Sequence, residues 1–487
     1  MALLTRNVFL VALGVIGTYG TWGRCFQDGT LRYILTAVFS DKQPCLLPGT
    51  DREPLIKNMT GIWPLDRLLA VLVLFFWQAA DGSHPTTSAV GLYFAAQHLG
   101  LVVNMHLASL HGRSKLNPTL WTLLFQALAI GTAGPLYAFL HLSTAAAATT
   151  TTPHLNAAST TRAIRSLPLA CLLGYVLPAL LMALRGGHGF KQHAIAAWNV
   201  FPVWILLVQR LVQLAPTLLL SPSSSSSSSS SSFPSSSRAV YAATILVTAA
   251  AHVAAVALTA AAALFPMAFA PGYAAALRPG RVFVPPVALA PALSSSSSSS
   301  AATTTGISII TAGEGVRGFM LWDQAVGYAV VLFLAVDGLL GGSWGVGREE
   351  EEEEEGEKEA EESERMVRHP RSGGFAQPKM DVKVAVDDVG EIKKGRAAVR
   401  RPHAAAVAAA AERRRRGRLV GRDGRAWLVA GGAALLGAVL VGPAAVVLGL
   451  QWAADELAWK TAKEKKKRTG RSVATTGLRE GRADQGR

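Results

Sequence analysis

The sequence is poor in charge and cysteine for its length. Only 16% of its 487 residues are Asp, Glu, Lys or Arg, whereas soluble domains carry about 25%. The three cysteines, Cys25, Cys45 and Cys171, form neither a zinc-binding pattern nor a disulfide framework. Cys25 and Cys45 would pair only if their loop were lumenal. The shortage of charge argues against a soluble enzyme and indicates a membrane protein.

Motifs of common soluble enzymes are also missing. No phosphate-binding P-loop, dinucleotide-binding Gly-x-Gly-x-x-Gly turn or Gly-x-Ser-x-Gly nucleophile elbow occurs. There is no His-Glu-x-x-His cluster for a metal and no Asp-Asp-x-x-Asp motif that would ionise a diphosphate through magnesium. The sequence therefore predicts no cofactor and no bound metal.

Long apolar runs are what the chain has in abundance. A helix needs roughly 17–25 mostly apolar residues to cross a hydrocarbon core. We predict an all-α, polytopic transmembrane helix bundle of about seven to nine spans. The candidate spans are Ala2–Trp22, Pro64–Ala80, Ser88–Leu110, Thr119–Leu142, Ala163–Leu184, Ala194–Leu220, Ala239–Leu264, Gly318–Leu340 and Trp427–Gln451.

Low-complexity segments separate several of these runs. Serine homopolymers, an Ala/Thr tract and a run of glutamates cannot bury enough apolar surface to offset the chain entropy of folding, so they predict disorder. The predicted organisation is a bundle over 1–342 with disordered inserts at 143–161, 221–237 and 271–306, a disordered charged linker over 343–425, an accessory transmembrane helix over 426–452, and a basic cytoplasmic tail over 453–487.

The net charge of +15 comes largely from Arg413–Arg416 and Lys460–Arg487. Beside membrane spans, such clusters mark the cytoplasmic side and contact anionic lipid, so we expect a bilayer partner and no nucleic acid. The bias of Lys and Arg among the short loops places the N-terminus in the lumen and the basic tail in the cytoplasm, in the endoplasmic reticulum membrane. A glycan on the sequon at Asn58 would invert this topology.

Four aspartates lie within or at the ends of apolar runs. Asp66 and Asp81 mark the ends of one run, and Asp323 and Asp337 lie in another. A carboxylate at the centre of a membrane helix costs about 2.5–3.5 kcal/mol, so it normally faces a cavity or a partner. Alternating spans place Asp66 with Asp323 and Asp81 with Asp337. The pattern predicts a polar, proton-handling chamber, although interfacial helix caps would give the same pattern.

The third predicted span carries the polar residues Gln97, His98, Asn104 and His106. Such residues commonly hydrogen-bond neighbouring helices, and a histidine among them can also act as a base. Aromatic residues cluster near the acids, where they form interfacial belts or line a cavity that holds a carbocation. They are Trp63, Phe75, Phe76, Trp77, Tyr93, Phe94, Trp121, Trp198, Trp204, Trp322 and Tyr328.

Four stretches carry a family resemblance: CFQDGTLRY (Cys25–Tyr33), WPLDR (Trp63–Arg67), FWQ (Phe76–Gln78) and WDQAVGY (Trp322–Tyr328). They resemble fungal integral-membrane terpene cyclases of meroterpenoid biosynthesis, of the ascochlorin and macrophorin type. The likeness covers about three-fifths of the chain. It implies a helical bundle that protonates an olefin or epoxide of a lipophilic prenylated substrate and steers the resulting cation.

Residues and resemblance together predict a metal-independent terpene cyclase acting on a farnesylated aromatic or polyketide substrate. A carboxylic acid kept neutral in a dry site can donate the first proton. We assign Asp323 and Asp66 as the acid pair, with Asp81 as the next candidate, and His98 or His106 as the base. The alternatives are a proton-coupled transporter or a non-catalytic multi-span membrane protein.

Overall fold

The structure is a computed structural model of the chain that describes residues 3–40, 45–50, 53–146, 157–214, 232–286, 312–340 and 426–483. These residues form helices and no β-strand, apart from one isolated antiparallel bridge between Leu46 and Pro54. The predicted all-α class is therefore confirmed for the described part of the chain. The chain divides into two units, Met1 with Leu340–Gly431, and Ala2–Leu339 with Gly432–Arg487. The contacts discussed below lie within the second unit.

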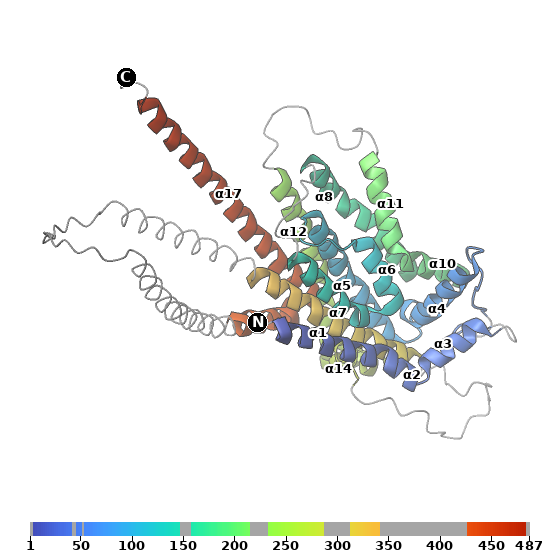
Figure 1. Cartoon of the computed structure of the whole chain (residues 1–487). Coiled ribbons are helices and arrows are strands. Elements are labelled where there is room, and N and C mark those ends of the chain that lie inside the picture. Colours follow the sequence, from blue (N-terminus) through green and yellow to red (C-terminus); the bar gives the residue numbers. More distant parts are fainter. Residues whose placement is uncertain are drawn as a thin grey trace, which may run out of the picture. The chain divides into compact units, whose positions relative to one another are not determined.

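The described residues form helices of very different lengths (Figure 1). In order they are α1 (Leu3–Thr18), a π-helical turn η1 (Tyr19–Gly23), α2 (Arg24–Gln27), α3 (Thr30–Phe39), α4 (Trp63–Ala80), α5 (Pro85–Leu110), α6 (Pro118–Leu128), α7 (Ile130–Ala146), α8 (Ala157–Cys171), a second π-helical turn η2 (Leu172–Val176), α9 (Leu177–Ala183), α10 (His188–Asn199), α11 (Phe201–Leu214), α12 (Ser232–Leu264), a 3₁₀ turn η3 (Pro266–Ala268), α13 (Tyr273–Ala276), α14 (Pro279–Phe283), a helix over Ala312–Leu340, a helix over Ala426–Val441, and α17 (Pro443–Ala483).

Five described helices are long and apolar enough to cross a bilayer, which is fewer than the seven to nine spans expected. A sixth is counted if the bent pair α10 and α11 is taken as one span. Several of them expose leucine and valine side chains on their outer faces, as lipid-facing helices do. The five helices are Leu4–Gln27, Trp63–Ala80, Ser159–Ala183, Ser235–Leu264 and Ala312–Leu340.

Breaks in three predicted spans explain part of the lower count. The run Thr119–Leu142 is divided at Ala129, which has a positive φ of 70°. The pair α10 and α11 bends by 69°, where Pro202 lacks the N–H that would continue the helical hydrogen bonds. The last predicted span is divided at Gly442, whose φ of 97° suits glycine. An apolar run predicts burial or membrane contact, but it does not predict that its helix is continuous.

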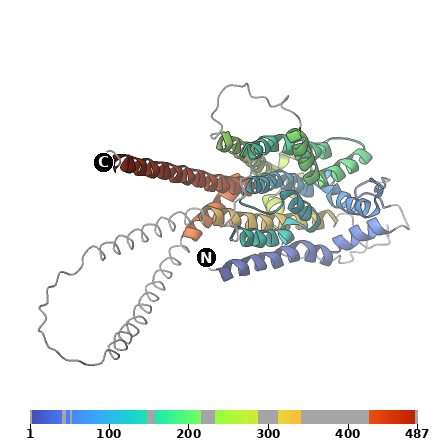
Figure 2. The same ribbon diagram turned by 45° about the horizontal axis from the view of Figure 1, so that its top comes forward.

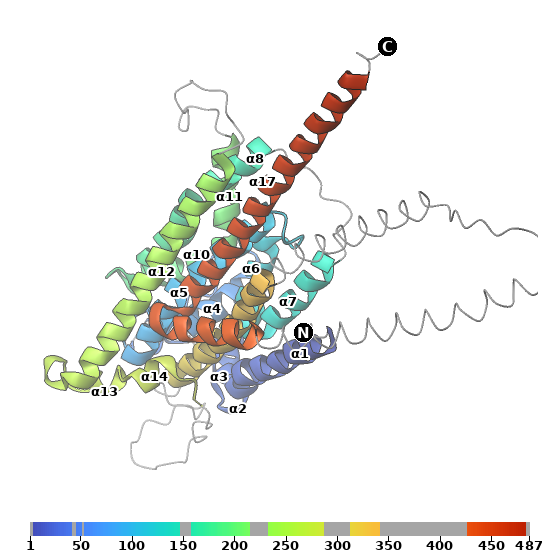
Figure 3. The same ribbon diagram turned by 90° about the vertical axis from the view of Figure 1, so that its left-hand side faces the viewer.

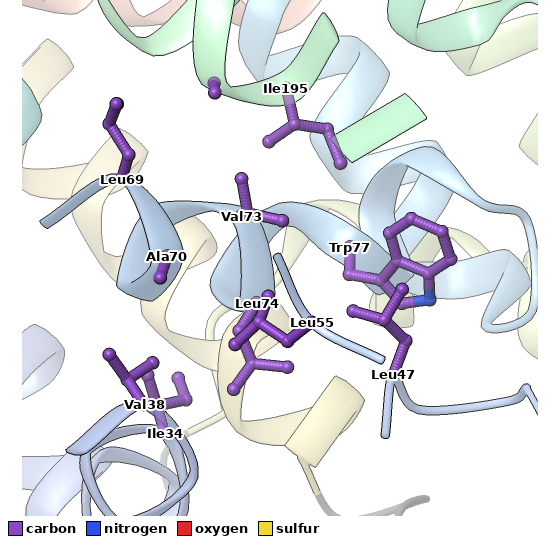
Figure 4. Close-up of a cluster of buried hydrophobic side chains, with 11 residues drawn as sticks. Ile34, Val38, Leu47, Leu55, Leu69, Ala70, Val73, Leu74, Trp77 and Ile195 are labelled. Carbon is purple, nitrogen blue, oxygen red and sulfur yellow. The ribbon is translucent and has the colours of Figure 1, made fainter. Parts of the chain in front are cut away.

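The apolar core around α4 fixes the position of its first turn. Residues spaced three and four apart along α4 pack on α3 from one side and on α10 from the other (Figure 4). The fully buried Trp77 also donates its indole N–H to the carbonyl oxygen of Pro48 at 3.0 Å. The cluster comprises Ile34, Val38, Leu47, Leu55, Leu69, Ala70, Val73, Leu74, Trp77, Ile195 and Ala196.

Helices α1 and α7 and the helix Ala312–Leu340 approach one another through small residues. A Cβ atom added to Gly17 would lie 1.9 Å from the carbonyl oxygen of Gly131, and one added to Gly20 would lie 2.7 Å from the ring of Trp322. Glycine at these positions therefore permits close helix packing of the kind common in membranes. As a result, the start of α7 lies against the part of Ala312–Leu340 that carries Asp323.

Helix α17 packs along α12 and α5, and its C-terminal half extends away from them (Figures 2 and 3). Gln97 of α5 accepts the N–H of Ala444 at 3.2 Å and donates to the carbonyl of Thr248 of α12 at 2.8 Å. One helix continues through residue 452, where the accessory span is predicted to end and the basic tail to begin.

The predicted inserts fall mostly outside the described residues. The described parts differ from the expectation of disorder, since α8 begins at Ala157, α12 begins at Ser232, and α13 and α14 lie within 271–306. Helix α14 packs on α5 and α12, and Val282 is buried in this contact. Tertiary contacts therefore order a segment whose composition alone predicts none.

The helix ends also pair differently from the predicted alternation. The hydroxyl of Thr87, in the first turn of α5, donates to the carbonyl of Gly313 at 2.9 Å. The start of Ala312–Leu340 therefore lies beside the turn that holds Asp81, whereas Asp337 lies at the opposite end of that helix. The expectation that Asp81 and Asp337 share one half of the bundle is wrong. That expectation assumed that every apolar run crosses the membrane completely.

Candidate functional site

A cavity of about 390 Å³ lies between α3, α4, α5, the α6–α7 junction and the helix Ala312–Leu340. Its volume falls within the roughly 300–1,000 Å³ typical of ligand pockets. Its lining is predominantly apolar and aromatic, with Asp323, His98, Arg67 and Gln126 as polar members. The aromatic lining residues are Trp22, Phe39, Trp63, Phe75, Phe76, Phe94, Phe125 and Phe319.

Asp323 reaches this cavity from the middle of Ala312–Leu340 and is only 4% exposed. Its Oδ1 accepts the backbone N–H of Gly131 at 2.7 Å. Gly131 lies in the first turn of α7, where N–H groups have no partner within the helix. Ala129, which has a positive φ, separates α6 from α7 immediately before this turn. The junction between α6 and α7, in the cavity wall, thus supplies the N–H donor that fixes the Asp323 carboxyl group.

This arrangement suits a proton donor. A carboxylic acid can accept a hydrogen bond on one oxygen while it carries its proton on the other. Apolar surroundings favour the neutral form of such a group over the ion. Asp323 is therefore held by backbone N–H groups at the start of α7, in a wall that otherwise consists largely of hydrocarbon and aromatic rings.

His98 lies in the same cavity wall, on α5, and is 1% exposed. Its ring stacks on Phe94 at 5.4 Å between centroids and meets the edge of Phe201 at 5.6 Å. Neither of its ring nitrogens has a hydrogen-bond partner among the described residues. Buried polar atoms are almost always paired, so an unpaired imidazole that lines a cavity indicates a role toward a ligand.

Asp66 has a different environment from Asp323, although both were predicted as acids. Its carboxylate accepts the backbone N–H groups of Met59, Thr60 and Gly61 at 3.0, 2.6 and 3.0 Å, and the Thr60 hydroxyl at 2.8 Å. It does not contribute to the cavity lining, whereas its helix neighbours Trp63 and Arg67 do. Asp66 therefore fastens the preceding loop to the first turn of α4.

Asp66→Ala is expected to lower the melting temperature of the purified protein by several degrees, because four hydrogen bonds to one carboxylate are lost together. Asp81→Ala is the matched control, since Asp81 is half-buried and bonds only Ser83 in the turn after α4. Thermal unfolding in detergent measures both. Equal melting temperatures for the two variants would contradict the fastening role of Asp66.

The other predicted site residues lie apart from the cavity. Asp81 accepts the N–H and hydroxyl of Ser83, both at 2.9 Å. His106 is buried, and its Nδ1 is paired with the carbonyl of Val102 at 2.9 Å. Neither side chain belongs to the lining. The structure thus brings together Asp323 and His98 and leaves Asp66, Asp81 and His106 in local hydrogen bonds.

Sequence reasoning missed several residues of the lining. Phe319 lies one helical turn before Asp323, and Phe125 with Gln126 precedes the break at Ala129. The sequence feature that could have identified them is their proximity to a predicted site residue or to the end of a helix. Four of the predicted aromatics line the cavity, Trp63, Phe75, Phe76 and Phe94, and the other seven do not. Among the described residues, no three His, Cys, Asp or Glu side chains are placed to hold a metal ion.

Residues 5–340 match the CtvD domain family. Terpene cyclase ctvD of Aspergillus terreus is 31% identical over 207 residues, covering 41% of this chain and 58% of the relative. Terpene cyclase ascI of Acremonium egyptiacum is 33% identical over 215 residues, covering 42% and 54% respectively. Terpene cyclase janA of Penicillium janthinellum is 28% identical over 216 residues, covering 43% and 58%.

The chain thus spans little more than half the length of these curated relatives. No solved structure matches it. The family matched and the names of the relatives confirm the resemblance predicted from the WPLDR and WDQAVGY motifs. The matched range includes both cavity residues, Asp323 and His98.

Proposed function

Because the chain belongs to the CtvD domain family, we propose that it is a membrane-bound terpene cyclase. It protonates an olefin or epoxide of a prenylated (farnesylated) aromatic or polyketide substrate and closes rings from the resulting cation. The single observation that supports this most directly is the aromatic cavity that holds Asp323 and the unpaired His98 in one wall. The names of the relatives support the same reaction class.

Asp323 is the proposed acid. Its carboxyl O–H transfers a proton to a terminal carbon–carbon double bond, or to the oxygen of an epoxide, which opens to a carbocation. Internal double bonds of the same chain attack this cation, so each ring closure moves the positive charge along the substrate. Phe75, Phe76 and Phe319 line the cavity, and the faces of aromatic rings attract such a charge.

His98 is the proposed base. A ring nitrogen accepts the proton that leaves the carbon next to the last cation, which forms a double bond and ends the reaction. The proton gained from Asp323 and the proton lost to His98 balance, so the product is an isomer of the substrate. Asp66 is proposed to position the first turn of α4, which carries Trp63 and Arg67 into the cavity wall.

The proposed location is the endoplasmic reticulum membrane, with the basic residues of α17 against anionic lipid. The apolar outer faces of α1 and α12 support a membrane setting. A farnesylated substrate partitions into the same bilayer, because each buried CH₂ group favours hydrocarbon over water by about 0.8 kcal/mol. Enzyme and substrate would thus meet within the membrane.

Membranes from a heterologous host that express the full chain are expected to convert a farnesylated phenol or its epoxide into a cyclic isomer of unchanged mass. Mass spectrometry with chromatographic separation detects it, and EDTA is expected to leave the rate unchanged because the proton comes from a carboxylic acid. Membranes without the protein are the control. Conversion that stops with EDTA and recovers with magnesium would contradict the proposed chemistry, and accumulation of unchanged substrate inside vesicles would favour the transporter.

A further inference from the structure

The residues that line the cavity differ widely in their exposure. Its most buried lining residues, between 1% and 7% exposed, include His98, Asp323 and Phe94. These three come from α5 and Ala312–Leu340, and the equally buried Cys25, Ile34 and Phe125 come from α2, α3 and α6. The large apolar lining residues that are exposed come instead from α3 and α4, and the smaller exposed Ala127 comes from α6. The large ones are Leu35, Phe39, Trp63 and Leu68, which are 41%, 50%, 64% and 45% exposed and which we call the apolar mouth.

The chemistry of the apolar mouth favours hydrocarbon over water. Four large apolar side chains around one opening are unfavourable in contact with water, because exposed apolar surface costs free energy in proportion to its area. Helix α3 has ten residues and is too short to cross a bilayer, so it supports a position at the membrane surface. Trp63 suits the same depth, since tryptophan concentrates where headgroups meet hydrocarbon.

A polar group lies directly inside the apolar mouth. Arg67 lines the cavity one helical turn beyond Trp63, and its guanidinium donates to the carbonyl of Val38 at 3.1 Å. This contact joins the end of α3 to the start of α4. A long arginine side chain commonly keeps its charged end near polar surroundings while its stem contacts apolar groups. The opening is thus apolar outside, cationic at its neck and aromatic within.

We propose that a prenylated substrate enters the cavity from the bilayer through the apolar mouth, hydrocarbon end first. The hydrocarbon chain passes Leu35, Phe39 and Leu68 and reaches Asp323, while the polar aromatic head stays at the neck beside Arg67. The identification of the hydrocarbon part of the substrate as a prenyl group rests on the proposed function. The direction of binding rests on the exposure gradient and on the position of the cation. This direction of binding makes the end of the prenyl group farthest from the aromatic head the first site of protonation.

Photoaffinity labelling of the full chain in membranes tests this route without requiring turnover. Two farnesylated phenols are used, one with a diazirine on the phenol ring and one with a diazirine at the terminal isoprene unit. The head probe is expected to label peptides of α3 and α4, and the tail probe those that contain His98 or Asp323. Excess unmodified farnesylated phenol should suppress both. Exchange of the two patterns would overturn the direction of binding.

Leu68→Gln is expected to reduce tail-probe labelling near Asp323 about tenfold, the loss that removal of one leucine-sized apolar contact produces. Leu92→Gln is the matched control, since Leu92 is 71% exposed on α5 and does not line the cavity. Size-exclusion profiles in detergent show whether both variants remain folded. Equal labelling of the two variants would overturn the apolar mouth as the route.

The labelling and the cyclisation assay separate this inference from the proposed function. Labelling as expected without any cyclic isomer supports the route and overturns the cyclase activity. Formation of the cyclic isomer with competed head-probe labelling outside α3 and α4 supports the activity and overturns the route. Absence of both competed labelling and product overturns both.

Discussion

Asp323→Asn is expected to lower the rate of cyclisation by about 10²–10⁴-fold, the usual contribution of a general acid. Asparagine keeps the size of the side chain and an oxygen that can accept the Gly131 N–H, but it carries no acidic proton. The variant should therefore remain folded. Conversion of a farnesylated phenol or its epoxide by membranes measures the rate, and an immunoblot measures the amount of protein.

Asp337→Asn is the matched control on the same helix. Asp337 is half-buried and does not line the cavity, so its loss should leave the rate close to that of the wild type. A small effect of Asp323→Asn would mean that this carboxylate only caps the start of α7 through Gly131. A loss of protein rather than of rate would indicate the same structural role.

His98 offers a consistency check within the same cavity. Its stacking on Phe94 and its edge contact with Phe201 need an aromatic ring, but they do not need the ring nitrogens. Packing thus accounts for the position of the side chain and leaves its nitrogens unexplained. A base that accepts a proton from a hydrocarbon cation would account for both, since the nitrogens must be free to meet the substrate.

The sequence predicts the helical class well, because long apolar runs leave few other ways to satisfy backbone hydrogen bonds. It predicts span continuity poorly. The breaks at Ala129 and at the α10–α11 bend depend on local dihedral angles that hydropathy does not contain. The break at Ala129 matters most, because it supplies the N–H of Gly131 that fixes Asp323.

The sequence also could not distinguish Asp323 from Asp66. Each is a single carboxylate in or beside an apolar run and within three residues of a tryptophan. The difference arises from tertiary contacts, since a loop closes over Asp66 whereas the aromatic cavity lies beside Asp323. The cavity itself combines residues from both ends of the matched range, such as Trp22 and Phe319. Their proximity requires the folded bundle.

The C-terminal helix raises a question that the family match leaves open, since the match ends at residue 340. Asp455 of α17 is 4% exposed and lies among polar side chains of α12 and of the turn that follows α5. Its carboxylate is 2.9 Å from Nδ1 of His111 and 3.3 Å from Nη1 of Arg113, and it accepts the hydroxyl of Tyr241 at 2.8 Å. This cluster is where α17 makes its buried polar contacts with the bundle beyond the first turn.

Asp455→Ala is expected to destabilise the docking of α17 by about 3–5 kcal/mol, the cost of removing one partner from a buried ion pair. The loss is large because the buried His111 side chain and Tyr241 hydroxyl would both lose the carboxylate that they contact. Limited proteolysis of the protein in detergent should then cut within α17, and thermal unfolding should begin at a lower temperature.

Glu456→Ala is the matched control at the adjacent position, because Glu456 pairs with Arg238, a half-exposed residue. Ion pairs on exposed surfaces contribute little to stability, so this variant should resemble the wild type in both measurements. A proteolysis pattern for Asp455→Ala that matches the control would contradict the docking role of the carboxylate. The expected pattern would instead show that α17 is a structural part of the bundle, because α5 and α12 then depend on contacts with a segment beyond the family match. Deletion of α17 would in that case expose Gln97 and Thr248 on a face that the matched range alone does not cover.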